Sequence, residues 1–398
     1  GEIMNNAQFI NGLNDTCKAI LKEKYPVFSE AEYQRRFSLI ETVIKQKKLD
    51  KVIIYEALGS GNAVQYFTGW HTTQEALVEI RENENLNLYV EHYNHLPMAE
   101  KLINNRTKLF WGQRQLANKI LPEMINDLGQ NNTIGIIGRL PYSYITQLQQ
   151  KNIRVIDISK DYNLMRSIKS NEEISWMKIA SALTDEGINN IVSNLKPGLN
   201  EHEMSQITQC GYLKHGGHKI INFFGITDMD NPENCVPYQY TSNKNITKND
   251  IITTEISSHF WNYPGQVLRT IGFKKMTPLY NELHAVGDEV FSTIFSILKD
   301  GTTIEEINAV SSKIEDGSFS IWDDLIHGYG GGYLDPVLGT KSRPASSYEG
   351  FKFKENMTVV IQPNVITNDH KAGIQTGELV HIQKDKSVRM HSFKMGYI

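Results

Sequence analysis

The segment around His327 has the residue types that proton transfer needs. His327 stands directly before a glycine-rich run, with tyrosines at positions 329 and 333. Imidazole is the side chain whose ordinary pKa lies closest to neutral pH, so a histidine can act there as a general acid or base. Glycines allow a ligand to approach the backbone closely. We therefore expect His327 to be catalytic, although a lone histidine is more often structural.

Glu255 is a carboxylate within an apolar and threonine-rich run, residues 251–257, that is typical of a buried strand. A buried carboxylate without a partner is unfavourable, so we expect either a catalytic role or an ion pair with a cation such as Arg269. Gln266 and Gln362 lie in similar runs. They are expected to bind substrate, and the alternative is that both are hydrogen-bonded core amides.

The elements that must hold these residues alternate between helix and strand patterns. Helical spacing of apolar residues predicts two helices in about the first 50 residues. Strand-like runs follow at 52–55, 87–90, 133–137 and 155–158. This alternation predicts one small α/β domain over residues 1–165.

The pattern changes after a boundary near residues 161–166. A helix capped by Ser170 or Asn171 ends before Pro197, and a second long helix covers 279–298, followed by a shorter one at 304–314. Strand-like runs cover 251–257, 266–272, 358–362 and 379–383. The length of 398 residues also favours two domains, so residues 166–398 should form the larger one.

Composition narrows the classes of function. Lys plus Arg total 41 against 45 for Asp plus Glu, and the net charge of -4 argues against a nucleic-acid or anionic-membrane partner. No stretch approaches the roughly 18 apolar residues of a membrane span. The three cysteines form no CxxC pair, which fits a reducing compartment. We expect a cytoplasmic protein whose partner is a small-molecule substrate, with no nucleic acid and no membrane.

Several strings, taken together, resemble the creatinase, prolidase and aminopeptidase P superfamily. In order they are GNAVQYFTGW, LKPGLNEHEM, NDIITTEIS, RTIGF, IHGYGGGY and NMTVVIQPNVI. The resemblance covers nearly the whole chain and implies an α/β (α+β) fold. It implies a small N-terminal creatinase-like domain at 1–165 and a C-terminal pita-bread domain at 166–398. In relatives the loop that here begins at His71 extends toward a neighbouring subunit, so we expect a homodimer with His71 near the substrate.

In the metal-dependent members, two Asp, one His and two Glu bind two divalent ions. The resemblance places Glu255 and Gln266 at the Asp positions, His327 at the His position, and Gln362 and Gly377 at the Glu positions. Glu378 lies beside the last of these and is a candidate for substrate binding. Neutral amides cannot balance two divalent ions, so we expect no metal and no cofactor.

Four more residues join the candidate site. Tyr238 falls where creatinase has its catalytic histidine, and it is expected to be catalytic here. Tyr263 and Tyr329 lie on segments that border the substrate in relatives. His218, in the KHGGHK loop, is expected to bind substrate, and a solvated loop histidine is its alternative.

These residues predict a metal-independent, creatinase-like hydrolase acting on a C–N bond of a small polar, amino-acid-like or amidine-like substrate. His327 would be the general acid or base and Glu255 would assist proton transfer or anchor a cationic group. Elimination and rearrangement stay open. One alternative is a Xaa-Pro dipeptidase with a depleted metal site, and another is a non-catalytic binding or scaffolding protein.

Overall fold

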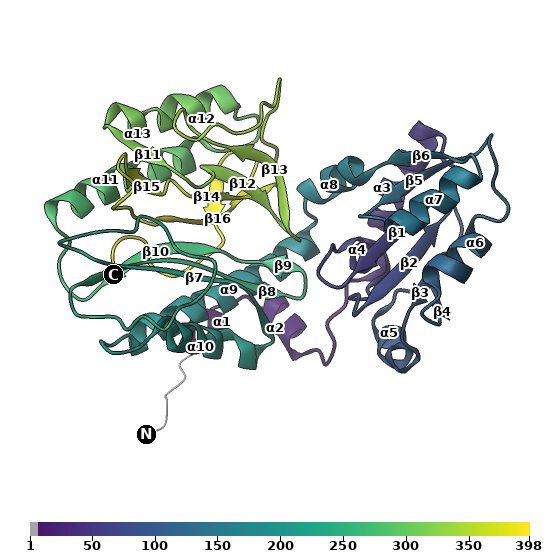
Figure 1. Cartoon of the computed structure of the whole chain (residues 1–398), viewed down its shortest axis with the longest axis horizontal. Helices are drawn as coiled ribbons and strands as arrows, with labels where there is room; N and C mark the ends of the chain where they lie inside the picture. The colour runs from purple at the N-terminus through teal and green to yellow at the C-terminus, as the bar shows by residue number, and fades with distance from the viewer. Residues whose placement is uncertain (1–6) are drawn as a thin grey trace. The chain divides into compact units, whose positions relative to one another are not determined.

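The computed structural model describes residues 7–398, and the chain divides into two compact units (Figure 1). The smaller unit is Glu23–Arg166. The larger unit is Ser167–Ile398 together with the N-terminal residues up to Lys22. Each unit contains both helices and a mixed or antiparallel sheet.

The N-terminal helices α1 (Gln8–Asn11) and α2 (Asp15–Lys22) belong to the larger unit, which corrects the expectation that they are part of the small domain. The backbone N–H groups of Phe9 and Ile10 donate to the Glu186 carboxylate at 2.8 and 3.1 Å. The Phe9 ring lies 6.0 Å from that of Phe393. Helical spacing predicts that a helix has an apolar face, but the partner core is set by contacts far away in the sequence.

The smaller unit is built on a six-stranded sheet in the order β4-β3-β2-β1-β5-β6. The strands are β1 (Lys51–Ala57), β2 (Glu75–Ile80), β3 (Leu86–Val90), β4 (Thr107–Trp111), β5 (Thr133–Ile137) and β6 (Arg154–Asp157). The helices are α3 (Glu30–Lys47), α4 (Ala63–Thr68), α5 (Leu96–Leu102), α6 (Leu121–Met124), α7 (Tyr142–Gln150) and α8 (Ser159–Ser167), with short turns η1 (Tyr93–His95) and η2 (Leu116–Ile120). The four expected strands fall in β1, β3, β5 and β6.

The larger unit is built on an antiparallel sheet in the order β13-β12-β14-β16-β10-β8-β7, with β17 paired to β16 and β9 to β8. Its strands are β7 (Gly217–Asp228), β8 (Asp250–Phe260), β9 (Tyr263–Pro264), β10 (Val267–Gly272), β12 (Ile326–Tyr329), β13 (Tyr333–Leu338), β14 (Thr358–Ile361), β16 (Gly377–Ile382) and β17 (Ser387–Arg389). A separate pair is formed by β11 (Phe319–Ile321) and β15 (Val365–Thr367). All four strands expected in this unit are present as β8, β10, β14 and β16.

Helices cover one face of this sheet. The helices are α9 (Asn171–Asn194), α10 (Glu201–Tyr212), α11 (Pro278–Ile297), α12 (Ile304–Ser311) and α13 (Lys313–Asp316), with a turn η3 (Leu213–His215). In Figure 1, α9 and α10 lie along β7 and β8, while α11 packs near β14 and β15. None of the helices among residues 7–398 is long and apolar enough to span a bilayer.

The start of α9 illustrates why the sequence folds in this way. Ser170 accepts a hydrogen bond from the Glu173 backbone, and the Glu173 carboxylate accepts one from Ser170 N–H, which satisfies two donors at the helix start. Farther along, α9 passes so close to Gly265 that a Cβ there would lie 2.6 Å from the Ser181 Cα. Glycine at 265 therefore lets the helix lie directly against the turn that leads into β10.

Candidate functional site

The strand register places Glu255 and His327 on the same face of the larger sheet. Glu255 in β8 pairs with Leu268 in β10, which pairs with Gly377 in β16. His327 in β12 pairs with Val360, which pairs with Leu379 in β16. Paired residues share a face, as do residues two apart on one strand. The opposite face of β8 and β10 carries Ile256 and Val267, in one apolar cluster with residues of α9 and α10, so the polar residues occupy the face away from those helices.

Glu255 and Gln266 are in direct contact. The Gln266 Nε2 donates to the Glu255 Oε1 at 2.8 Å, and Gln266 is buried. Burial raises the pKa of Glu255 to about 8, with further contributions from the charges of Asp323 and Asp324, and the Gln266 hydrogen bond opposes this. Near neutral pH, Glu255 is therefore mostly protonated and can donate a proton.

His327 is 1% exposed and held in one tautomer. Its Nδ1 lies 3.0 Å from the Gly328 carbonyl oxygen, which can only accept, so Nδ1 carries the hydrogen and Nε2 has the lone pair. The ring stacks on Tyr333 at 3.9 Å between centroids. Burial lowers the pKa of His327 to about 4, against the opposing effects of the Gly328 carbonyl, Asp324 and Gln362. The imidazole is thus neutral near pH 7 and can accept a proton.

Two carboxylates that the sequence analysis did not select, Asp323 and Asp324, lie beside these residues. Asp323 Oδ2 accepts hydrogen bonds from Asn364 Nδ2 at 2.8 Å and Gln375 Nε2 at 3.1 Å. Burial raises the pKa of Asp323. Asp324 is buried, forms an ion pair with Arg343 and accepts the Tyr333 hydroxyl. The adjacent acidic pair in WDDLIH, three and four residues before His327, was the available signal.

These residues define what we call the polar cluster: Glu255, Gln266, Asp323, Asp324, His327 and Gln362. Gln362 is 4% exposed, and its backbone N–H donates to Leu325 O at 2.9 Å, which holds it against the acidic loop. The Gln362 side chain lies within hydrogen-bonding range of the His327 ring. Contacts join Glu255 to Gln266, and the charge of Asp324 acts on both Glu255 and His327. That Glu255, Gln266, His327 and Gln362 form one site stays a prediction.

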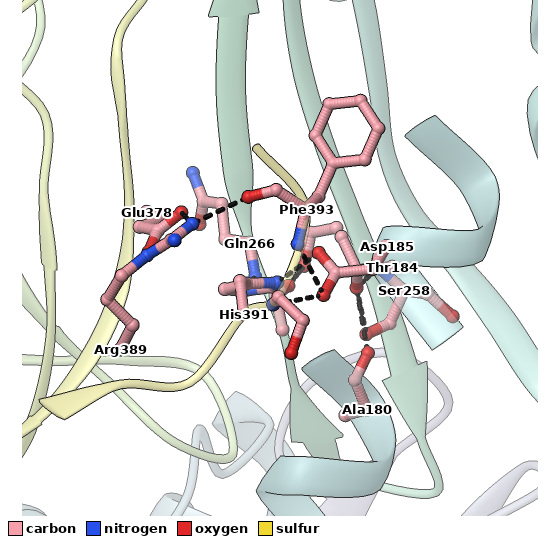
Figure 2. A network of polar contacts seen from close by, with 12 residues as sticks. Ala180, Thr184, Asp185, Ser258, Gln266, Glu378, Arg389, His391 and Phe393 are labelled. Atoms are coloured by element: carbon pink, nitrogen blue, oxygen red, sulfur yellow. Dashed lines mark hydrogen bonds and ion pairs between the residues drawn. The ribbon is translucent and has the colours of Figure 1, made fainter. Parts of the chain in front are cut away.

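A second hydrogen-bond network fixes Gln266 from behind (Figure 2). The Gln266 backbone N–H donates to His391 Nε2 at 3.1 Å, and His391 Nδ1 donates to Asp185 Oδ1 at 2.8 Å. Asp185, on α9, also accepts the backbone N–H groups of Ser392 and Phe393 at 2.7 and 3.3 Å. The C-terminal segment therefore ties α9 to the start of β10, next to the amide that contacts Glu255.

Glu378 lies on the other face of the sheet, which contradicts its expected role in substrate binding. It pairs with Val267 and so shares the helix-covered face. Its carboxylate, fully buried, forms ion pairs with Arg269 at 2.6 Å and with Arg389. Burial alone would raise the pKa of Glu378, but the two arginines hold it below its ordinary value. Arg269 therefore pairs with Glu378 and not with Glu255.

Tyr238 and Tyr263 are also outside the polar cluster, contrary to expectation. Tyr238 bridges to Phe224, which pairs with Thr254, so it lies on the face opposite Glu255, and its side chain is 55% exposed. The Tyr263 hydroxyl donates to Glu173 at the start of α9, which indicates a structural role. The family resemblance indicates which segment lies near the site. Which face of the sheet a side chain occupies depends on its position in the strand, and a shift of one residue changes that face.

Tyr329 does border the cluster. Its ring lies edge-on to His327 at 5.3 Å, and its hydroxyl lies 3.1 Å from the Ser257 hydroxyl. His218 is exposed at the far end of β7 and pairs with His259 of β8. His259 shares the face of Glu255, and burial, followed by the charge of His218, lowers the pKa of His259 to about 3. The sequence analysis missed His259.

His71 belongs to the smaller unit, in the segment between α4 and β2. Its expected place near a neighbouring subunit's substrate stays a prediction.

The five positions implied for metal ligands do not fit a two-metal centre. Two of them are neutral glutamines, and Glu255 is paired to one of these. At the fifth, Gly377 has φ +146, and a Cβ there would lie 2.1 Å from the Ile361 carbonyl oxygen, so the backbone leaves no room for a liganding side chain. Within residues 7–398, no group of three or more His, Cys, Asp or Glu side chains is arranged to hold a metal ion.

A hollow of about 690 Å³ lies elsewhere in the larger unit. It is lined by α12 residues and by the loop that follows β13, including Glu305, Asn308, Lys341 and Tyr348. None of the residues that line this hollow belongs to the polar cluster. The candidate site is therefore identified by its titratable and polar side chains and not by the volume of a cavity.

Known structures share this fold. The prolidase from Pyrococcus furiosus superposes with a TM-score of 0.73 at 20% identity, covering 89% of this chain and 99% of that one. The Xaa-Pro dipeptidase from Bacillus anthracis gives 0.75 at 16% identity, covering 92% and 100%. These likenesses confirm the expected α/β fold with a pita-bread domain.

Sequence comparison gives the family. The Xaa-Pro dipeptidases of Pyrococcus furiosus and Pyrococcus horikoshii are 23% and 24% identical to this chain, covering 62% and 68% of it and 70% and 76% of those proteins. They fit the dipeptidase alternative better than the creatinase-like hypothesis, and they do not support metal independence. The model of metallopeptidase family M24 matches residues 175–384, more than half of the chain. The resemblance to the creatinase, prolidase and aminopeptidase P superfamily is thereby confirmed, the membership supports an enzyme of the hydrolase class, and the chain belongs to metallopeptidase family M24.

Proposed function

We propose that this protein hydrolyses the C–N bond of small peptides, with Xaa-Pro dipeptides as the first substrate class, at a site depleted of metal ligands. The family and the two dipeptidase relatives support this substrate class. The position of the polar cluster, on the face of the sheet away from α9 and α10, supports the location.

The proposal rests on two groups of the polar cluster, Glu255 and His327, whose protonation states near neutral pH are opposite. Near neutral pH, Glu255 holds a proton and the His327 imidazole is neutral. Groups whose surroundings drive their pKa values apart are suited to act as an acid and a base in one reaction. His327 is the proposed base and Glu255 the proposed acid.

The proposed step balances as follows. Water adds to the peptide carbonyl carbon and gives a proton to His327 Nε2, while a new C–O bond forms. The C–N bond then breaks, and the Glu255 carboxyl gives its proton to the departing nitrogen. The products are an acid and an amine, and transfer of the proton from His327 back to Glu255 restores both groups. Gln266 holds the Glu255 carboxyl in place through its hydrogen bond.

The test is release of proline from L-alanyl-L-proline, measured after dialysis against a chelator and again after addition of Mn²⁺. His327→Ala and Glu255→Gln should each lower kcat/KM by about 100-fold or more, the usual contribution of an acid or base. Tyr240→Phe, a matched control at an exposed tyrosine, should retain the wild-type rate. Full activity in His327→Ala would contradict the proposed role.

A second candidate is favoured by the backbone at Gly377, which leaves no room for a fifth metal ligand. It is metal-independent hydrolysis of a small polar, nitrogen-containing substrate by the same acid and base. Elemental analysis separates the two candidates: one or two tightly bound ions per chain at full occupancy would overturn metal independence. A homodimer and a cytoplasmic location stay predictions.

A further inference from the structure

The acidic side of the polar cluster has more negative groups than positive partners. Asp324 forms an ion pair with Arg343. In the part of the chain that the structure describes, no ion pair within 4 Å is made by Glu255 or Asp323, and both are partly exposed. Glu255 lies close enough to Asp323 and Asp324 to interact with their charges. Carboxylates so placed are stabilised by an added positive charge.

Asp323 is held by a scaffold of amides. Both amide donors, Asn364 Nδ2 and Gln375 Nε2, go to its Oδ2. Asn364 Oδ1 accepts the Thr376 N–H at 3.0 Å, and the Gln375 backbone N–H donates to the Thr270 hydroxyl at 2.9 Å. No described donor reaches Asp323 Oδ1, so this oxygen remains available to a ligand.

One further acceptor at this place is buried without a donor. Gln375 is fully buried, and its Oε1 accepts no hydrogen bond from residues 7–398. The Gln375 amide is bonded to Asp323, so its Oε1 lies beside that carboxylate. A buried acceptor without a donor is unfavourable, so this oxygen indicates a missing hydrogen-bond donor.

The ring of Tyr333 lies beside these acidic side chains. Tyr333 donates its hydroxyl to Asp324 and stacks one face on His327, while its side chain remains 53% exposed. The faces of aromatic rings attract organic cations. The spread of the acceptors, with no set of three arranged for a metal in the described chain, favours a group with several N–H donors over a single ion.

We propose that Asp323 and Asp324, beside the protonated Glu255, form a subsite that binds an organic cation, an ammonium or guanidinium group of the substrate. The subsite adds a substrate-binding role to the proposed function. Only the assignment of the cation to the substrate rests on that function. Asp323 is the residue that binds the cation through Oδ1, and Asp324 is positioned by Arg343 and Tyr333.

The test is a nuclear magnetic resonance titration of the full chain with methylguanidine and with N-methylurea, its neutral isostere. Wild-type protein should bind methylguanidine about tenfold more tightly, the usual advantage of a charge-assisted hydrogen bond. Asp323→Asn keeps the shape and should bring the two affinities within about threefold. Asp316→Asn, an exposed control on α13, should behave as the wild type. Urea denaturation of each variant verifies that it is folded.

Equal binding of the two probes by the wild type would overturn the subsite, as would an unchanged preference in folded Asp323→Asn. Displacement of methylguanidine by Mn²⁺ at about one ion per chain would also overturn it, because the subsite would then take a metal. If methylguanidine binds as expected but no Xaa-Pro dipeptide is hydrolysed, the subsite stands and the proposed function fails. If the dipeptide is hydrolysed but the wild type shows no preference for the cationic probe, the proposed function stands and the subsite fails.

Discussion

Replacement of Glu255 by glutamine should make the protein more stable at neutral pH while it removes the proposed acid. In the folded protein the pKa of Glu255 is raised from its ordinary value of 4.5 to about 8. The folded state therefore binds more protons than the unfolded state between these values, so the free energy of unfolding falls as the pH rises. Each pH unit contributes about 1.4 kcal/mol, which gives a destabilisation of roughly 3 kcal/mol at pH 7 and roughly 5 kcal/mol above pH 8.

Glutamine at 255 keeps an oxygen that can accept from Gln266 Nε2, but it carries no titratable proton. The wild type and Glu255→Gln should thus have similar stability at about pH 4.5, and the variant should gain roughly 3 kcal/mol over the wild type at pH 7. Urea denaturation at a series of pH values, followed by linear extrapolation, measures this difference. Glu282→Gln, at an exposed position of α11, is the matched control and should show no such trend.

A stability difference that stays constant between about pH 5 and pH 8 would refute the reasoning, because the effect depends on a proton held by Glu255. A variant less stable than the wild type at pH 8 would refute it as well. That result would mean that a cation pairs with the carboxylate.

Three other substitutions test the structure around the cluster by urea denaturation. Arg269→Met should lower the free energy of unfolding by about 3 kcal/mol or more, because Glu378 stays buried with one cation fewer. Gly377→Ala should lower it by about 2 kcal/mol or more, since its Cβ would clash with the Ile361 carbonyl, whereas Gly129→Ala, with open space around it, should change it by less than about 1 kcal/mol. His391→Leu should lower it by about 3 kcal/mol, because the Asp185 carboxylate and the Gln266 N–H each lose a buried partner. A change below about 1 kcal/mol in any of the three would contradict the burial argued for that residue.

Local patterns predicted the long helices α9 and α11 and eight of the strands in the described chain. The capping residues of α9 and the apolar runs of β8, β10, β14 and β16 lie where the sequence indicated them. These signals act over a few residues, so the sequence carries them directly. Helical spacing predicted two helices in about the first 50 residues, where the structure has α1, α2 and α3. The assignment of residues 7–22 to the small domain was wrong, because their contacts with Glu186 and Phe393 lie far along the chain.

Glu255 and Glu378 show a property that local sequence patterns do not predict, the face of the sheet that a side chain occupies. Both are carboxylates in strands, and the sequence analysis expected both at the substrate. The register puts Glu255 opposite Leu268 and Glu378 opposite the next residue, Val267, so the two side chains occupy opposite faces. Glu255 holds a proton, and Glu378 forms ion pairs with two arginines. A shift of one residue in a strand changes the face completely, and one sequence alone does not specify that register.

By itself, the sequence determined the long helices, eight of the strands, the order of the family motifs and the loss of three of the four carboxylates at the implied metal positions. Those features depend on residue identity and short spacing. The tertiary structure alone decided that Asp323 and Asp324 join Glu255 and His327, since the amides that hold Asp323 come from 41 and 52 residues away. It also decided the protonation of the cluster, because burial and neighbouring charges, which set a pKa, arise only when distant strands come together.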